Sequence, residues 1–240
     1  MSRIALVTGG TRGIGKAISR HLHGQGYRVI ANYGGDDQAA ADFSGETGIP
    51  SLRFDVSDFD RTRTAVASIE EEWGPIDILV NNAGITRDSM FHKMDTDAWS
   101  SVLQTNLTSC FNTCRAVIGG MRERKFGRIV NVSSMNGQAG QLGQANYAAA
   151  KAGMIGFSKS LALETAGKGI TVNVVAPGYI DTEMCRTVPE PVLEKVIAKI
   201  PVGRLGEVDE VARAVAYLVG EDGGFITGST LSINGGQLML

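Results

Sequence analysis

Residues 4–16 read IALVTGGTRGIGK, and this stretch decides the fold. The apolar run at 4–8 predicts a buried strand, and residues 13–23 predict a helix. The glycine-rich turn between them would present backbone N–H groups and the positive end of the helix to an anion. The stretch therefore predicts a strand–turn–helix unit that holds the phosphates of a nucleotide.

Each glycine of the turn has a separate expected use. Gly9 permits a tight turn, Gly13 lets a pyrophosphate approach the backbone, and Gly15 allows close packing of helix on strand. The spacing is G-x-x-x-G-x-G, which differs from the G-x-G-x-x-G of many dinucleotide folds. A glycine turn without a ligand is the alternative interpretation.

The same turn partly matches a second phosphate-binding motif. Residues 10–16 fit the G-x-x-x-x-G-K core of a nucleoside-triphosphate P-loop. That motif continues with Ser or Thr, whose hydroxyl binds Mg²⁺, whereas this chain has Ala17. The missing hydroxyl argues against an ATPase.

The rest of the chain alternates short apolar runs with longer helical patterns. Strands are expected at 4–8, 28–33, 51–54, 76–80, 127–132, 170–175 and 230–233. Helices are expected at 13–23, 58–73, 96–124, 146–165, 192–200 and 208–219. Such alternation predicts an α/β fold with a single doubly wound parallel sheet flanked by helices. We expect one domain over 1–240, with the irregular stretch 178–204 as a lid over the substrate.

Composition narrows the class of protein. The formal net charge of −2 gives no reason to expect nucleic acid or a membrane surface as partner. No run of about 18 apolar residues is present, and the N-terminus lacks the pattern of a signal peptide. A cytoplasmic protein is the expectation. The three cysteines and three histidines show no metal-ligand spacing, so we expect no metal.

A candidate catalytic group lies in the second half of the chain. Tyr147 and Lys151 are four residues apart on an expected helix and share a face, and Ser134 follows the preceding strand. A nearby ammonium favours the phenolate, so we expect Lys151 to lower the pKa of Tyr147. Tyr147 would then exchange a proton with a substrate oxygen that Ser134 holds. The alternative is a packed tyrosine beside a solvated lysine.

Further motifs stand in a consistent order. They are Asn81-Asn82-Ala83-Gly84 after the fourth strand, Asn106, and Pro177-Gly178 after the sixth. With the glycine turn and the Ser134/Tyr147/Lys151 spacing, the chain resembles the short-chain dehydrogenase/reductase family over nearly its whole length. The resemblance implies a Rossmann-type fold, a nicotinamide cofactor and a homotetramer. It also implies an active site of Ser134, Tyr147, Lys151 and Asn106, with Asn106 positioning a water beside Lys151.

The expected cofactor site combines the turn with positions that the resemblance implies. Its residues are Gly9, Thr11, Arg12, Gly13, Ile14, Gly15, Asp55, Val56, Asn82, Ala83, Gly84, Tyr147, Lys151, Pro177, Gly178, Ile180 and Thr182. Asp55 would contact the adenine, or alternatively cap a turn. Thr182 would contact the nicotinamide end, or alternatively cap the next segment. The alternative role for Asn106 is that of an amide inside a helix whose side chain bonds only to the backbone.

The second strand ends in Ala31-Asn32-Tyr33, without the acid that an NAD-specific site uses for the ribose hydroxyls. Arg12 would reach a 2′-phosphate, so NADPH is the expected cofactor. Asp36 and Asp37, slightly further on, complicate this interpretation.

The segments around the site resemble those of the branch that reduces β-ketoacyl thioesters. The expected reaction is reduction of acetoacetyl-CoA to (R)-3-hydroxybutyryl-CoA, and reduction of a 3-oxoacyl chain on acyl carrier protein is the alternative. Asp88, Gln141, Gln144 and Tyr179 would contact the substrate beside Ser134 and Tyr147. Solvated glutamines in a loop are the other interpretation. A basic patch for either acidic carrier would comprise Arg122, Arg124, Lys125, Arg128 and Lys168.

Overall fold

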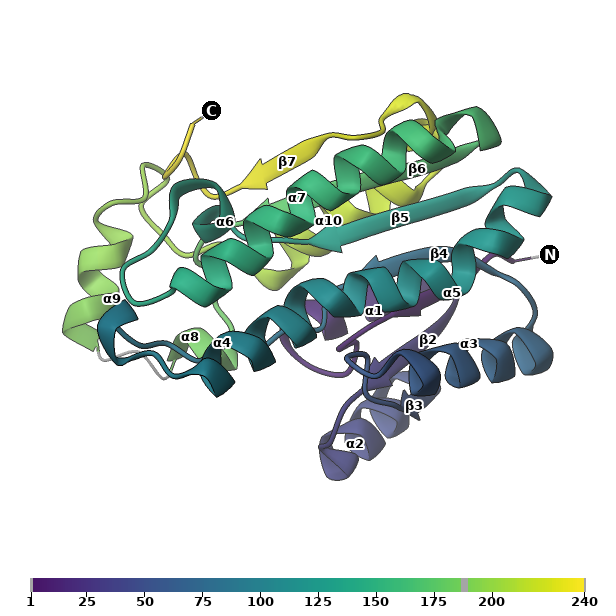
Figure 1. Ribbon diagram of the computed structural model, residues 1–240, viewed down its shortest axis with the longest axis horizontal. Helices are drawn as coiled ribbons and strands as arrows, with labels where there is room; N and C mark the ends of the chain where they lie inside the picture. Colours follow the sequence, from purple (N-terminus) through teal and green to yellow (C-terminus); the bar gives the residue numbers. More distant parts are fainter. Residues whose placement is uncertain (1, 187–189, 240) are drawn as a thin grey trace.

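The computed structural model describes residues 2–186 and 190–239. Its centre is a seven-stranded sheet in the order β3-β2-β1-β4-β5-β6-β7, and every neighbouring pair is parallel (Figure 1). The strands are β1 Ile4–Val7, β2 Arg28–Tyr33, β3 Ser51–Arg53, β4 Ile76–Asn81, β5 Gly127–Val132, β6 Ile170–Pro177 and β7 Thr230–Ile233. This confirms the predicted doubly wound parallel sheet.

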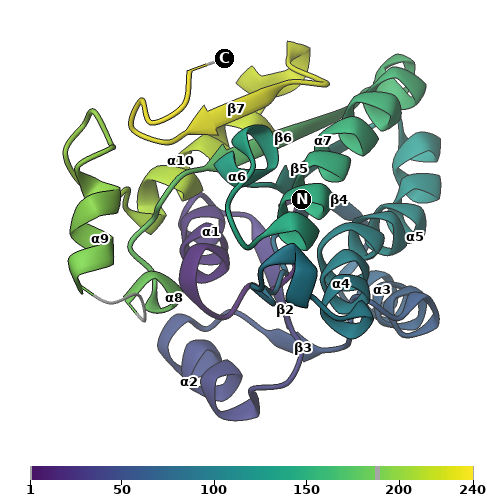
Figure 2. The same cartoon turned by 60° about the vertical axis from the view of Figure 1, so that its left-hand side comes forward.

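Helices cover both faces of the sheet (Figure 2). One layer contains α1 Gly13–Gly24, α2 Asp37–Thr47 and α10 Val208–Val219; the other contains α3 Phe59–Trp73, α4 Thr96–Leu103, α5 Ser109–Arg124 and α7 Ala145–Thr165. Shorter helices are α6 Met135–Ala139, α8 Glu183–Arg186 and α9 Glu190–Ile197. Single turns are η1 Phe91–Lys93, η2 Gln104–Thr108, η3 Ala166–Lys168 and η4 Asp222–Phe225.

Three local features differ from the expected pattern. The segment that forms α2 has little apolar periodicity, because it buries only Ala40 and Phe43. Its start is instead fixed by Asp36, whose carboxylate accepts a hydrogen bond from Ala39 N at 3.0 Å. The short α6 was also not expected. The predicted helix at 96–124 is interrupted by the π-helical turn η2.

The sheet is buried on both faces, which explains its continuous apolar runs. All four residues of β1, six of β5 and eight of β6 are buried. Two apolar layers result, one against α1 and α10 and the other against α3, α5 and α7.

A buried chain of polar side chains crosses the second layer. Asn81 on β4 donates to Asn131 Oδ1 on β5 at 2.8 Å, and Asn131 donates to Ser158 Oγ on α7 at 2.8 Å. Thr113 on α5 donates to Asn81 Oδ1 at 2.7 Å. Since a buried amide without a partner is costly, this chain fixes how α5 and α7 sit on the sheet.

The strand order reverses beside β1, which lies between β2 and β4. In open parallel sheets, ligands bind beyond the carboxyl ends of the strands at such a point. The glycine turn leaves β1 at this position, and α4, α6, α8 and α9 surround the same edge (Figure 1).

We expect Gly15→Ala to destabilise the protein, because the added methyl group would collide with the carbonyl oxygen of Gly9. Overpacking against rigid neighbours costs about 1–3 kcal/mol or more. Gly24→Ala, at the other end of α1, is the matched control, since nothing lies within 4 Å of that position. Its free energy of unfolding should stay equal or rise by up to about 1 kcal/mol. Urea unfolding compares the two, and equal midpoints would contradict the close packing.

Candidate active site

The glycine turn is shaped by positive backbone angles and by one buried asparagine. Gly9 has φ +59° and Gly13 has φ +51°, which side chains rarely tolerate. Asn32 on β2 accepts the N–H of Gly9 on its side-chain oxygen at 3.3 Å and the N–H of Gly10 on its backbone oxygen at 2.9 Å. Asn32 was not singled out from the sequence, although an amide within the apolar run of β2 is the signal.

The motif after β4 holds the same turn from the other side. Asn82 Nδ2 donates to the carbonyl oxygens of Thr8 at 3.0 Å and Gly9 at 3.1 Å. The Thr8 hydroxyl accepts the N–H groups of Asn82 and Ala83 at 3.0 and 3.1 Å. The side chain of Asn82 is therefore committed to shaping the turn.

The turn fits the phosphates of a dinucleotide. The first residue of α1 follows Arg12, whose side chain makes no capping hydrogen bond to the helix. A Cβ added at Gly13 would meet nothing nearer than the Thr182 methyl group at 3.9 Å, so the backbone there is open toward Thr182. Lys16, the lysine of the P-loop-like pattern, forms an ion pair with the Glu46 carboxylate on α2 at 2.6 Å. Its ammonium is therefore paired within the protein, which argues further against a P-loop.

Ser134, Tyr147 and Lys151 lie together at the carboxyl end of β5. Ser134 caps α6 and accepts the N–H of Asn136 at 3.1 Å, and its hydroxyl lies near enough to the Tyr147 phenol to lower the pKa of that phenol. Lys151 Nζ lies 5.5 Å from the centre of the Tyr147 ring and donates to the carbonyl oxygen of Val132 at 2.7 Å. The neighbouring Ser133 donates to the Lys151 carbonyl at 2.8 Å.

The electrostatics of this group differ from the expectation. Burial raises the pKa of the Tyr147 phenol, the Ser134 hydrogen bond lowers it, and the Asp88 carboxylate raises it. The predicted lowering by Lys151 is therefore wrong, because desolvation dominates and the ammonium group points to Val132. Burial also lowers the pKa of Lys151, to about 8, and the nearby Cys110 opposes that shift.

Asn106 occupies the middle of the π-helical turn η2 and is fully buried. Its side chain accepts the N–H of Ile85 at 2.8 Å and donates to the Ile85 carbonyl at 2.9 Å. This is the backbone-bonded amide considered as the alternative. A Cβ at Gly84 would lie 3.1 Å from Asn106 Oδ1 and 3.7 Å from Lys151 Nζ, so Gly84 separates the two side chains. The Asn106 carbonyl accepts from the Cys110 thiol at 3.5 Å, so the second N–H of the Asn106 side chain is the group left to hold a water.

The expected substrate residues fall into two groups. Gln144 donates to the Asp88 carboxylate at 2.8 Å and accepts from Asn136 Nδ2 at 2.9 Å. Asp88 and Gln144 are therefore linked through Asn136 to the segment that carries Ser134. Gln141 is exposed, and Tyr179 is partly buried just beyond β6. Asn136 was missed from the sequence, where nothing distinguishes it from a solvated loop residue.

The remaining cofactor candidates lie at the same edge, and several of them already bond to, or pack against, other parts of the protein. Asp55 accepts from the N–H and the hydroxyl of Ser57 at 2.9 and 2.7 Å, which is the turn-capping alternative, and the Val56 side chain lies in the core. Gly178 N donates to Ile233 O at 2.8 Å, and Ile180 is buried. Thr182 accepts from Cys185 N at 3.3 Å and so caps α8.

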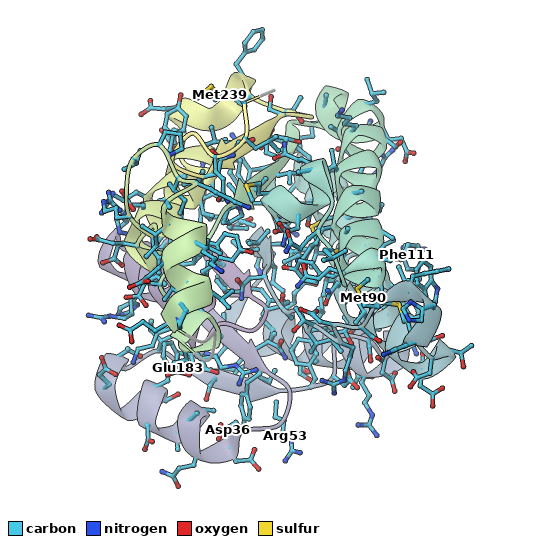
Figure 3. The ribbon with its side chains drawn as sticks, turned by 90° about the vertical axis from the view of Figure 1, so that its left-hand side faces the viewer. Asp36, Arg53, Met90, Phe111, Glu183 and Met239 are labelled. Atoms are coloured by element: carbon cyan, nitrogen blue, oxygen red, sulfur yellow. The ribbon has the colours of Figure 1, made fainter. Side chains whose placement is uncertain are left out.

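Figure 3 views the carboxyl edge along the strands. Arg53, the last residue of β3, and Asp36, which follows β2, lie at one end of this view, while Met90 and Glu183 lie on opposite sides of it. The expected basic patch is not at this edge. Arg128 belongs to the start of β5, at the opposite end of the sheet from Ser134, and is buried. Arg124 is bound to Ile76 O at 2.8 Å.

The buried ammonium of Lys151 predicts a pH-dependent stability. Its pKa is lowered from 10.5 to about 8, so folding disfavours the charged form. The resulting destabilisation is complete below about 8 and is relieved as pH rises from there to 10.5. Relative to Lys151→Met, the wild type should therefore gain up to about 3 kcal/mol in free energy of unfolding over this interval. Urea unfolding of both proteins measures the difference; a constant difference would contradict a buried charged lysine.

Among the described residues, no helix is long and apolar enough to cross a membrane, and no group of three His, Cys, Asp or Glu could hold a metal ion. Cys110 and Cys114 are free and buried, as expected for small apolar side chains.

Comparison with known proteins identifies the family of the chain. A family model described as enoyl-(acyl carrier protein) reductase matches residues 9–237. The chain is 60% identical over its full length to an acetoacetyl-CoA reductase of Shinella zoogloeoides, also covered completely, and 57% identical to one of Paracoccus denitrificans with the same coverage. It is 46% identical to the 3-oxoacyl-[acyl-carrier-protein] reductase of Escherichia coli, over 99% of this chain and 98% of that protein. The chain belongs to the short-chain dehydrogenase/reductase family and is an oxidoreductase that uses a nicotinamide cofactor.

Proposed function

We propose that this protein reduces acetoacetyl-CoA to (R)-3-hydroxybutyryl-CoA with NADPH. The observation that carries the proposal is the grouping of Ser134, Tyr147 and Lys151 at the carboxyl edge, beside a turn that fits a dinucleotide. The names of the relatives at 57–60% identity over their whole length support the substrate.

The site residues divide the work of reducing a ketone. The cofactor supplies a hydride to the carbonyl carbon when bound. The Tyr147 phenol, protonated because burial raises its pKa, donates a proton to the carbonyl oxygen as that carbon is reduced. Ser134 lies within hydrogen-bonding reach of the phenol and holds the same oxygen. Lys151 stabilises the phenolate that remains, and Asn106 positions the water through which its proton is replaced.

The preference for NADPH rests on the charges near the end of β2. Arg12 is exposed at the start of α1, where a 2′-phosphate would lie. Asp36 caps α2, and Asp37 lies 2.9 Å from Arg53. Both carboxylates thus bond to nearby groups of the protein. Neither is therefore free to bind the ribose hydroxyls of NAD, which favours NADPH.

Other expectations remain part of the proposal. We infer one domain over 1–240, a cytoplasmic homotetramer, and a lid over about 178–204; of that lid, residues 187–189 lie outside the described residues. Ile180 bridges to Gly206, which ties the start of the lid to its far end. Gln141 and Tyr179 are the polar groups proposed to face the thioester.

The alternative is a reductase of 3-oxoacyl chains on acyl carrier protein. The lower identity of 46% to such enzymes supports it less well. The displaced basic residues do not separate the two carriers, because a patch at the amino end of β5 lies away from Ser134 for either one.

The direct test compares initial rates of NADPH oxidation with acetoacetyl-CoA and with acetoacetyl-acyl carrier protein, each repeated with NADH. We expect a higher kcat/KM for the CoA ester and for NADPH. Tyr147→Phe should lower kcat by at least about 100-fold, because general acid catalysis contributes this much, while NADPH affinity, measured by fluorescence titration, stays near that of the wild type. Preference for the carrier-protein substrate would favour the alternative, and normal turnover by the variant would exclude Tyr147 as proton donor.

The pH dependence of reduction should follow Lys151. Both protons that the reaction needs, on the Tyr147 phenol and the Lys151 ammonium, are present at low pH. Lys151 loses its proton first, near about 8, so kcat/KM should fall as pH rises through that value. Cys110→Ala should retain this decline, since burial raises the pKa of the Cys110 thiol to about 11. A flat profile to higher pH would contradict a role for the ammonium.

A further inference from the structure

Asp88 is joined to the catalytic serine by a continuous chain of hydrogen bonds. Its carboxylate accepts from Gln144 Nε2 at 2.8 Å, and Gln144 Oε1 accepts from Asn136 Nδ2 at 2.9 Å. The N–H of Asn136 then donates to Ser134 Oγ at 3.1 Å. Since Gln144 is held at both ends of its amide, the position of the Asp88 carboxylate is fixed relative to Ser134.

The backbone around Asp88 is held as well. Ser89 N donates to the Gly143 carbonyl at 2.9 Å, and Asn146 Nδ2 donates to the Arg87 carbonyl at 3.0 Å. Asn146 is fully buried at the start of α7 and precedes Tyr147 directly. Asp88 is exposed, but hydrogen bonds on both sides hold its backbone in place beside the first turn of α7.

The negative charge of Asp88 acts on two phenols from different elements. The Asp88 carboxylate raises the pKa of the Tyr147 phenol, although its effect is smaller than those of burial and of the Ser134 hydroxyl. After burial and Cys185, it also raises the pKa of Tyr179, which follows β6. A carbonyl group that comes within reach of the Tyr147 phenol is therefore also under the potential of Asp88.

We propose that Asp88 is a selectivity residue that excludes β-keto acids bearing a free carboxylate and admits neutral thioesters or esters. This inference rests on the proposed function. In acetoacetate the carboxylate is only two bonds from the ketone carbon, so binding the ketone at Tyr147 brings that negative charge close to Asp88. A thioester or ester is neutral at the same position, and the phosphates of CoA lie many bonds away. Like-charge repulsion of this kind is an established means of rejecting a competing ligand.

The test compares acetoacetate with its neutral methyl ester as substrates. Neither contains CoA, so the two differ at this position in charge and in the small methyl group alone. Wild type should show a kcat/KM for the ester at least about tenfold above that for the acid. Asp88→Asn should narrow this ratio by about tenfold, chiefly by raising kcat/KM for acetoacetate. The asparagine can still accept from Gln144, so the chain to Ser134 is retained. Asp97→Asn removes an exposed charge from the first turn of α4 and should leave the ratio unchanged.

Two further readouts separate charge from structure. Asp88→Glu retains the charge and should retain the preference for the ester. Raising ionic strength from about 0.01 M to about 1 M should narrow the wild-type ratio but not that of Asp88→Asn, because screening acts on the repulsion alone.

The outcomes distinguish this inference from the function on which it rests. If wild type and Asp88→Asn both reduce the ester with the same ester-to-acid ratio, the selectivity role is wrong and the reductase proposal stands. If wild type reduces neither acetoacetyl-CoA nor the ester, the proposed function fails and the inference fails with it.

Discussion

The carboxyl edge of this protein is organised by one buried positive charge. Lys151 is only 3% exposed, and an ammonium group taken out of water must find compensation inside the protein. Its Nζ donates to the last carbonyl of β5, while its own carbonyl accepts from Ser133. These two bonds tie α7 to the end of β5, and the helix in turn presents Tyr147 one turn earlier, beside Ser134.

Small residues around the lysine make this arrangement possible. A Cβ at Gly137 would lie 2.7 Å from Lys151 Cβ and 2.8 Å from its carbonyl carbon, so α6 can approach α7 only because that residue is glycine. Gly84 stands between the ammonium and Asn106 in the same way. Further along α7, Ser158 bonds Asn131 and extends the attachment of the helix down the sheet. Helix position, strand end and site geometry are consequences of the same close packing.

The sequence predicted the sheet because burial on both faces leaves a simple apolar pattern, as in β5 and β6. Helical spacing placed Tyr147 and Lys151 on one face, but only the resemblance to a known family singled them out together with Ser134 as a catalytic group. The sequence did not predict α2, where a cap at Asp36 determines the start and periodicity is weak. It also gave the wrong direction for the pKa of Tyr147, since desolvation depends on packing that no spacing reveals. The structural roles of Asn32 and Asn136 could not be predicted, because they lie in contacts with residues distant along the chain.

Two charges of opposite sign lie near Tyr147, one buried and one exposed. Lys151 is buried, and its ammonium lies 5.5 Å from the centre of the Tyr147 ring, whereas Asp88 is exposed and its carboxylate raises the pKa of the phenol. Because water screens Asp88 more than Lys151, salt and substrate charge should act mainly on the outer group. In the proposed function, Lys151 therefore serves the proton transfer away from the solvent, while Asp88 acts on the choice of substrate at the surface. A site arranged in this way can change its preference by altering Asp88 without altering the lysine on which its geometry depends.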